Sequence, residues 1–146
     1  VKYVVGKCAL IHSLDSLRLA AEIEKQSAKR EVSTHVLIEV NSGREEAKGG
    51  LLPEEVEAFA DTVKREYPHL VLRGIMTMAP VCAAKEEYRP FFRETAAIFR
   101  RLSESGMLEG EPVLSMGMSA SYEVALECGS SMVRLGSTLF GERKVL

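Results

Sequence analysis

The feature that most constrains the fold of this chain is the alternation of short apolar runs with amphipathic helical patterns. Runs rich in Val, Ile and Leu favour burial in a sheet, and apolar residues spaced by three and four indicate helices that cover it. The runs that predict strands are Cys8–His12, His35–Asn41, Val71–Thr77, Val113–Met118 and Ser131–Gly136. Helices are expected between all five runs, so the strands pair in parallel through right-handed crossovers and the fold class is α/β.

The expected helices have clear starting points and buried sides. Ser13 or Asp15 can cap the first helix, which runs to about Ala28, and Ser119 or Ser121 can cap a short fourth helix. Apolar stripes mark the buried sides of the second and third helices. These stripes are Val56, Phe59, Ala60, Val63 and Tyr67, then Phe91, Phe92, Thr95, Ile98, Phe99 and Leu102.

Two α/β architectures are compatible with this pattern. An open, doubly wound sheet needs only about five or six strands. A closed (β/α) barrel needs eight strands and typically about 250 residues. The length of 146 residues favours the open sheet, whereas the residues that follow the last two strands favour a piece of the barrel.

The composition excludes several classes of partner. The 19 basic and 21 acidic residues give a net charge of −2, which offers no electrostatic footprint for nucleic acid or an anionic membrane surface. No apolar run approaches the roughly 20 residues that cross a bilayer. Cys8, Cys82 and Cys128 form no CxxC pair, and no set of His, Cys and carboxylates has metal-ligand spacing. We therefore expect a cytoplasmic protein without nucleic-acid, membrane or metal partners.

Small and hydroxyl residues follow the last two predicted strands. Gly136-Ser137-Thr138 follows the fifth strand, and Gly117-Met118-Ser119-Ala120-Ser121 leads from the fourth strand directly into a helix. Glycine lets backbone approach an anion, and hydroxyls and free amides at a helix start donate to it. Each stretch alone is typical of a plain helix cap or strand exit. Together they predict an anion site, because barrel proteins commonly bind phosphate after their last two strands.

One charged residue, Arg134, lies inside the apolar fifth strand. An unpaired guanidinium is costly to bury, so Arg134 has to meet a carboxylate, carbonyls or a ligand. The pattern leaves a structural ion pair with Glu39 and a contact with a ligand equally open. For His12, at the end of the first strand, and Lys48, after the second, the simplest interpretations are a hydrogen-bonded histidine and a solvated lysine.

Several segments resemble the pyridoxal phosphate homeostasis protein family (YggS/PROSC). They occur in the family's order and cover nearly the whole chain, and the last two are the most specific. The segments are Leu10-Ile11-His12-Ser13-Leu14-Asp15; Val40-Asn41 with Gly43-Arg44-Glu45-Glu46 and Lys48; Leu72-Arg73-Gly74-Ile75-Met76-Thr77-Met78; Leu114-Ser115-Met116-Gly117-Met118-Ser119; and Val133-Arg134-Leu135-Gly136-Ser137-Thr138-Leu139-Phe140-Gly141.

The resemblance implies a partial (β/α)8 TIM barrel of the alanine-racemase N-terminal type. About five parallel strands, corresponding to barrel strands 4–8, would alternate with helices. Residues 1–146 would then be a single domain, the C-terminal part of a pyridoxal-phosphate-binding barrel that lacks the first three strands. The family's Schiff-base lysine belongs to the first barrel strand, and none of Lys2, Lys7 and Lys48 matches its motif. We therefore expect pyridoxal 5'-phosphate in the full-length protein, and an absent or non-covalent cofactor in this chain.

The resemblance also implies which residues contact the cofactor. Met118, Ser119, Gly136 and Ser137 would hold its phosphate through backbone amides and the two hydroxyls, and Arg134 would face the pyridine nitrogen. A cation at that nitrogen keeps it unprotonated, which makes the ring a poorer electron sink.

The implied function is non-catalytic binding of pyridoxal 5'-phosphate in vitamin B6 and amino-acid homeostasis, with the small-molecule cofactor as partner. Two alternatives stand beside it. One is a fold-type III enzyme such as an amino-acid racemase, which continues into a second β-domain. The other is a cofactor-free assembly module, because exposed sheet edges favour homo-oligomers. Ser121 stands where the family often has an acidic residue, so any role of that carboxylate is lost.

Overall fold

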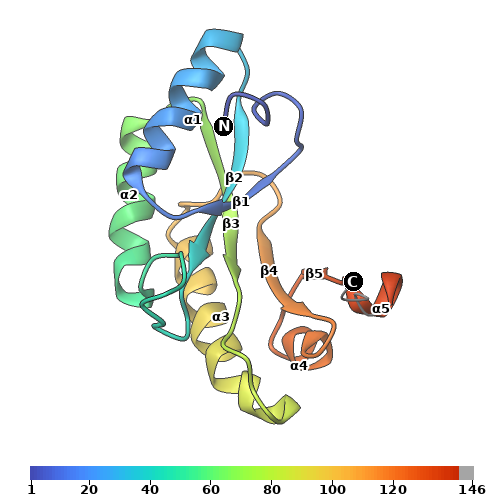
Figure 1. Cartoon of the computed structure of the whole chain (residues 1–146). Helices are drawn as coiled ribbons and strands as arrows, with labels where there is room; N and C mark the ends of the chain where they lie inside the picture. Colours follow the sequence, from blue (N-terminus) through green and yellow to red (C-terminus); the bar gives the residue numbers. More distant parts are fainter. Residues whose placement is uncertain (142–146) are drawn as a thin grey trace.

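The computed structural model describes residues 1–141, in which strands and helices alternate as the sequence predicts (Figure 1). The strands are β1 (Ile11–Leu14), β2 (Thr34–Val40), β3 (Leu70–Thr77), β4 (Val113–Met118) and β5 (Met132–Arg134). The α-helices are α1 (Leu17–Arg30), α2 (Val56–Glu66), α3 (Arg89–Glu104), α4 (Tyr122–Glu127) and α5 (Ser137–Phe140), and the short 3-10 helices are η1 (Pro53–Glu55) and η2 (Lys85–Tyr88).

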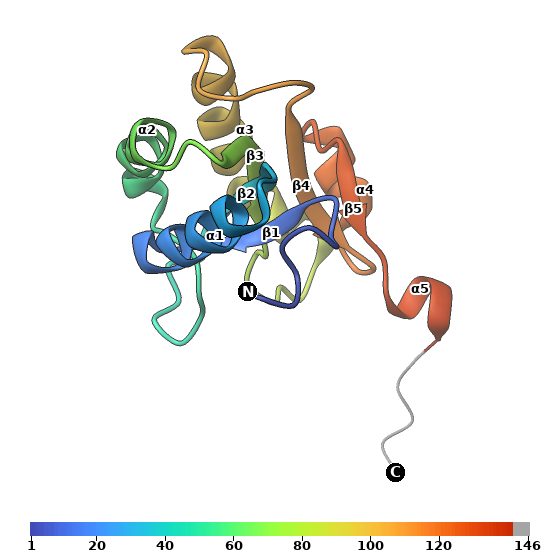
Figure 2. The same ribbon diagram turned by 90° about the horizontal axis from the view of Figure 1, so that it is seen from above.

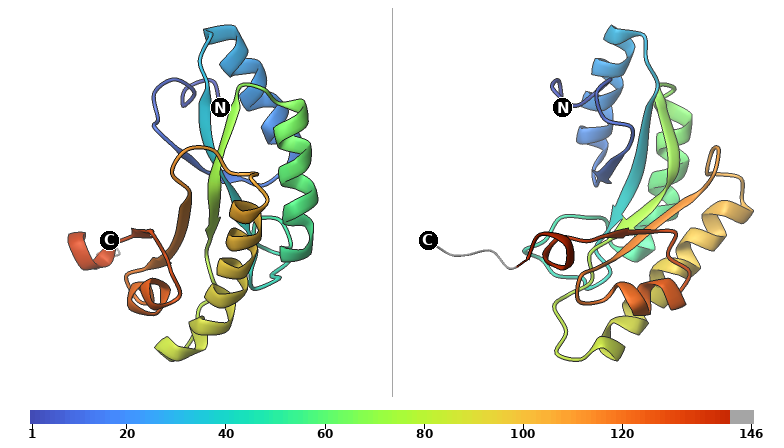
Figure 3. Two further views of the ribbon diagram at one scale, coloured as in Figure 1. Left: turned by 180° about the vertical axis from the view of Figure 1, so that it is seen from behind. Right: turned by 90° about the vertical axis from the view of Figure 1, so that its right-hand side faces the viewer.

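The five strands form one parallel sheet in the order β1-β2-β3-β4-β5. The order never reverses, so the doubly wound alternative is excluded, and successive right-handed crossovers place the connecting helices on the same face. Seen from above, α1 to α4 follow the outside of the curved sheet (Figure 2). Figure 3 shows the same layering from two further sides. The result is a half-barrel, which confirms the predicted partial barrel of five parallel strands.

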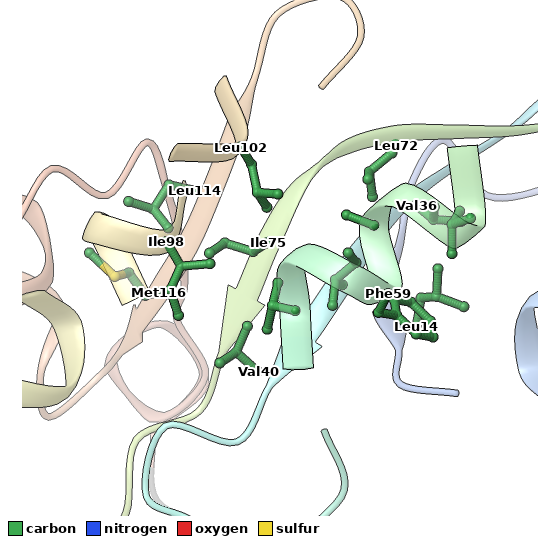
Figure 4. Close-up of a cluster of buried hydrophobic side chains, with 14 of the residues drawn as sticks. Leu14, Val36, Val40, Phe59, Leu72, Ile75, Ile98, Leu102, Leu114 and Met116 are labelled. Carbon is green, nitrogen blue, oxygen red and sulfur yellow. The ribbon is translucent and has the colours of Figure 1, made fainter. Parts of the chain in front are cut away.

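The helix-facing side of the sheet carries the hydrophobic core (Figure 4). In α2, four of the five residues of the predicted stripe are buried, and in α3 the buried residues are Phe92, Thr95, Ile98 and Leu102. Each fully buried large apolar side chain contributes about 1.5–3 kcal/mol relative to leaving it in water. The strand residues of this core include Leu14, Val36, Val40, Leu72, Ile75, Leu114 and Met116.

Irregularities in the strand pairing decide which side chains face away from the helices. In β1, Ile11 pairs with Val36 and Leu14 with Ile38, so three steps along β1 match two along β2. This bulge lets both Ile11 and Leu14 lie against the core, whereas His12, which directly follows Ile11, points toward the opposite face. Similar register shifts occur between β2 and β3 and between β4 and β5.

Glycines stand at the second and third irregularities. Gly74 has a φ of 152°, and a Cβ atom there would lie 1.9 Å from the carbonyl oxygen of Val113 in β4. Gly117 has a φ of 97° and lies where β4 passes into α4. Because of the extra residue in β4, Ser115 and Met118 are both paired with β5, opposite Met132 and Arg134. Single glycines within predicted strands are the sequence signal of such bulges.

Some local predictions were wrong. The first strand begins at Ile11 rather than Cys8, and the residue that caps α1 is Ser16, whose hydroxyl accepts from the amide of Leu19 at 3.3 Å. Ser13 belongs to the strand because the bulge extends it by one residue. The short helix α5 was not predicted. None of the helices in residues 1–141 is long and apolar enough to cross a membrane.

Candidate functional site

A pocket of about 330 Å³ lies at the carboxyl ends of β3, β4 and β5. All five residues that the family resemblance assigned to a cofactor are part of its wall, so residues from two separate segments meet here. The lining residues are Thr77, Met78, Ala79, Val81, Tyr88, Phe92, Gly117, Met118, Ser119, Ala120, Ser121, Arg134, Gly136 and Ser137. The carboxyl end of a parallel sheet is where α/β proteins bind their ligands.

Backbone amides converge on one side of this pocket. The hydroxyl oxygen of Ser119 accepts from the amides of Gly136 and Thr138, each at 3.2 Å. These two amides belong to the turn after β5, whereas Ser119 follows β4, so the contact joins the two predicted stretches. A hydroxyl oxygen that collects two amide protons occupies the position that an anionic oxygen would take. The donor set therefore fits a phosphate group.

The amide of Met118 already has a partner in the chain. It donates to the hydroxyl of Ser121 at 3.2 Å. Ser121 occupies the first position before α4, as predicted, but its side chain makes no bond to the amides of the helix itself. To use the Met118 amide, a phosphate has to displace this buried hydroxyl.

Arg134 is half-buried and makes two hydrogen bonds from different nitrogens. Nη1 donates to Ser115 Oγ at 2.7 Å, and Nη2 donates to the carbonyl oxygen of Thr77 at 2.9 Å. Burial lowers the pKa of Arg134, and the charge of Glu39 acts in the opposite direction. In the described part of the chain, the guanidinium forms no ion pair with Glu39, so that alternative for the role of Arg134 was wrong. A guanidinium has five N–H donors, so donors remain for an acceptor in the pocket.

Two residues that position Arg134 were missed by the sequence reasoning. Ser115 is fully buried in β4 between two apolar core residues, and Thr77 is fully buried at the end of β3. Thr77 Oγ1 is held by Ser42 Oγ at 2.9 Å and by the carbonyl oxygen of Val40 at 2.7 Å. The signal that could have found both is a polar side chain inside an apolar strand, at the level of a buried arginine.

Other polar residues at this end of the sheet lie outside the pocket. The side-chain amide of Asn41 donates to the carbonyl oxygen of Glu45 and accepts from its backbone amide. Lys48 is exposed, and its Nζ lies 2.6 Å from the carboxylate of Glu45. Lys48 is therefore the solvated lysine that the sequence indicated. No lysine lines the pocket within residues 1–141. In the same range, no group of three or more His, Cys, Asp or Glu residues is close enough to hold a metal ion.

Comparisons with known proteins agree on one family. The family model described as "Alanine racemase, N-terminal domain" matches residues 2–144. The chain is 46% identical over 145 residues to the "Pyridoxal phosphate homeostasis protein" of Aquifex aeolicus. The aligned residues make up 99% of this chain and 62% of that protein. The corresponding Helicobacter pylori protein is 38% identical over 136 residues, 93% of this chain and 59% of that protein. This chain therefore spans about three-fifths of the length of these two relatives.

Solved structures give the same result for the fold. PipY of Synechococcus elongatus, solved without PLP, superposes with a TM-score of 0.85 at 25% identity over 96% of this chain and 65% of PipY. The same protein has also been solved with PLP bound, at a TM-score of 0.77 and 23% identity over 96% of this chain and 64% of PipY. An alanine racemase from Clostridium difficile shares the fold. It superposes with a TM-score of 0.68 at 21% identity, over 93% of this chain and 36% of that enzyme.

Proposed function

Because this chain belongs to the alanine racemase N-terminal domain family, and its curated relatives are pyridoxal phosphate homeostasis proteins, we propose that it forms the phosphate-binding and pyridine-facing part of a pyridoxal 5'-phosphate site. The whole protein would serve vitamin B6 and amino-acid homeostasis without catalysing a reaction. The observation that carries the proposal is the convergence of Met118, Ser119, Arg134, Gly136 and Ser137 on one pocket.

The residues present suit the two ends of this cofactor. The amides of Gly136 and Thr138, which converge on Ser119 Oγ at 3.2 Å, would bind phosphate oxygens once the hydroxyl rotates away. Ser119 and Ser137 would add hydroxyl donors. Arg134, held from behind by two hydrogen bonds, would present its remaining N–H groups to the pyridine nitrogen.

The proposed absence of catalysis rests on the curated relatives, which are named homeostasis proteins, and the chemistry of Arg134 is compatible with it. When bound, the cofactor supplies an aldehyde that reacts with amines and a ring that withdraws electrons, most strongly when the ring nitrogen is protonated. A guanidinium keeps its protons at any ordinary pH, so Arg134 can donate a hydrogen bond to this nitrogen but does not protonate it. The racemase alternative has no separate support here, since the resemblance to racemases at 21% identity concerns the fold.

We further propose that the five strands correspond to barrel strands 4–8 and that the chain binds the cofactor reversibly. The relatives are longer, with 62% of the Aquifex protein matched, and the described pocket contains no lysine to form a covalent bond. The unpaired outer edges of β1 and β5 in the described sheet favour pairing with a second copy when no further strands cover them.

A titration of the chain with pyridoxal 5'-phosphate, followed by absorbance, tests the phosphate half of the site. We expect reversible binding that inorganic phosphate competes away. We also expect about 10- to 150-fold weaker binding in Ser137→Ala, because a hydrogen bond to a charged group contributes about 1.5–3 kcal/mol. Ser33→Ala, an exposed serine at the other end of the sheet, is the matched control. Equal affinities of Ser137→Ala and the unchanged chain would refute the assignment.

The covalent and pyridine contacts need separate measurements. After borohydride treatment, intact mass spectrometry should detect no stoichiometric adduct, and a single adduct at one lysine would overturn the reversible mode. Arg134→Ala should change the absorption spectrum of the bound cofactor more than Lys48→Ala, because Lys48 pairs with Glu45 outside the pocket. A larger change in Lys48→Ala would argue that Arg134 does not face the ring.

A further inference from the structure

Behind the pocket, three polar side chains from three strands form a connected row. Ser115 Oγ in β4 lies 2.7 Å from Nη1 of Arg134 in β5 and 3.3 Å from Nδ1 of His12 in β1. Ser115 is fully buried, so no solvent competes for its hydroxyl. Strand alternation creates this row, because His12 and Ser115 each directly follow a core residue, Ile11 and Leu114, and therefore lie on the face of the sheet opposite the helices.

The protons in this row can be assigned from donor chemistry. Arg134 has only N–H donors, so Ser115 Oγ accepts from it. The hydroxyl proton of Ser115 is then directed to the next acceptor, which is Nδ1 of His12. This arrangement requires a neutral imidazole that carries its proton on Nε2. A protonated His12 would instead donate from Nδ1 to an oxygen that already accepts from Arg134, and would leave the hydroxyl proton without this partner.

We propose that Ser115 and His12 are positioning residues for Arg134: neutral His12 orients the Ser115 hydroxyl, which fixes the guanidinium at the wall of the pocket. The consequence for ligand binding rests on the proposed function, whereas the hydrogen-bonded row itself belongs to the chain without ligand. The carbonyl oxygen of Thr77 bonds the other terminal nitrogen at 2.9 Å, so the two contacts together define the plane of the guanidinium. A planar group that is held at two nitrogens presents its remaining donors in a fixed direction.

The surrounding charges favour the neutral histidine. Burial lowers the pKa of His12, and the positive charge of Arg134 lowers it further. The acidic groups on neighbouring elements are Glu39 in β2 and Asp15 after β1. Burial raises the pKa of Glu39, Asp15 raises it as well, and Arg134 opposes both. A histidine with a lowered pKa binds fewer protons in the folded state than in the unfolded state. Its contribution to stability is therefore present above the unfolded value of about 6.5 and declines as the pH falls below it.

NMR spectroscopy of the three histidine rings tests the row without any ligand. At neutral pH, His12 should show the tautomer with its proton on Nε2. Replacing the cation, in Arg134→Gln, should raise the pKa of His12, because a positive charge beside the imidazole is removed. His35 is the internal control, because its ring bonds Arg73 instead and its ring signals should be the same in both proteins. A His12 ring with its proton on Nδ1 at neutral pH, measured in the unchanged chain, would overturn the proposal.

The effect on Arg134 is tested through the bound cofactor. In the unchanged chain, the absorption spectrum of bound pyridoxal 5'-phosphate should vary with pH across the titration of His12. This dependence should disappear in Ser115→Ala and return in Ser115→Thr, which restores a hydroxyl. A dependence that persists in folded Ser115→Ala, checked by circular dichroism, refutes the positioning role. Failure of the unchanged chain to bind the cofactor would refute the proposed function instead, and the NMR experiment would still decide the row.

Discussion

Replacing Gly117 with alanine tests whether the turn from β4 into α4 requires a residue without a side chain. The backbone of Gly117 has a φ of 97°, where L-residues with a Cβ are strained by about 1–3 kcal/mol. A Cβ atom there would also lie 2.6 Å from Cβ of Ala125 and 2.9 Å from Cα of Tyr122. Carbon atoms prefer separations of about 3.5–4.0 Å, so α4 has to move by about 1 Å.

The two costs can be separated with a second glycine. Overpacking of a close-packed site costs about 1–3 kcal/mol, so Gly117→Ala should lower the free energy of unfolding by about 2–6 kcal/mol in total. Gly106, after α3, also has a positive φ of 70°, but no atom lies within 4 Å of a Cβ placed there. Gly106→Ala should therefore carry the backbone cost alone and lose about 1–3 kcal/mol.

Urea unfolding followed by far-ultraviolet circular dichroism measures this difference. With a slope of about 2 kcal/mol per molar urea, the midpoint of Gly117→Ala should lie about 0.5–1.5 M below that of Gly106→Ala. The displacement of α4 should also lower the affinity of the pocket for inorganic phosphate. Phosphate should therefore compete less well with the cofactor, because Ser119 follows Gly117 by two residues. Equal midpoints for the two variants would refute the steric argument.

Two further predictions concern side-chain contacts, one between α1 and β2 and one between η2 and the start of α3. Ser27→Ala in α1 should cost about 1–3 kcal/mol in urea unfolding, because it leaves the buried Thr34 hydroxyl without the partner now at 2.7 Å. Arg89 at the start of α3 lowers the pKa of Glu86 through a side-chain hydrogen bond. This contribution is present above the unfolded pKa of Glu86, near 4.5, and is lost as the pH falls through the lower folded value. Between about pH 5 and pH 3, the thermal midpoint of Arg89→Ala should therefore fall less than that of the unchanged chain. Equal decreases of the two thermal midpoints over this range would contradict the prediction.

Much of the fold was predictable because it depends on local periodicity. The buried residues of α2 and α3 recur at the helical spacing, and the apolar runs of β2 and β4 are found within one residue of their predicted limits. Errors arose where a polar residue could serve two purposes. Ser13 and Asp15 were the predicted caps of the first helix, but Ser13 belongs to β1 and Ser16 caps the helix.

The candidate pocket was predictable in its residues but not in its present hydrogen bonds. Gly136 and Ser119 could be assigned to one anion site because the carboxyl ends of adjacent parallel strands meet. That the hydroxyl of Ser119 itself accepts from the amide of Gly136, or that Ser121 accepts from Met118, depends on rotamers that no local pattern encodes.

The amino-acid sequence by itself determined the order of strands and helices, the buried sides of the helices, and the end of the sheet where the candidate pocket lies. These features follow from hydrophobic spacing and chain direction, which are properties of short segments. Only the tertiary structure decided what Arg134 touches. Its partner Ser115 lies 19 residues away, and His12 lies 103 residues from Ser115. These contacts join β1, β4 and β5, which meet only when the sheet is assembled, so no local pattern in the sequence encodes them.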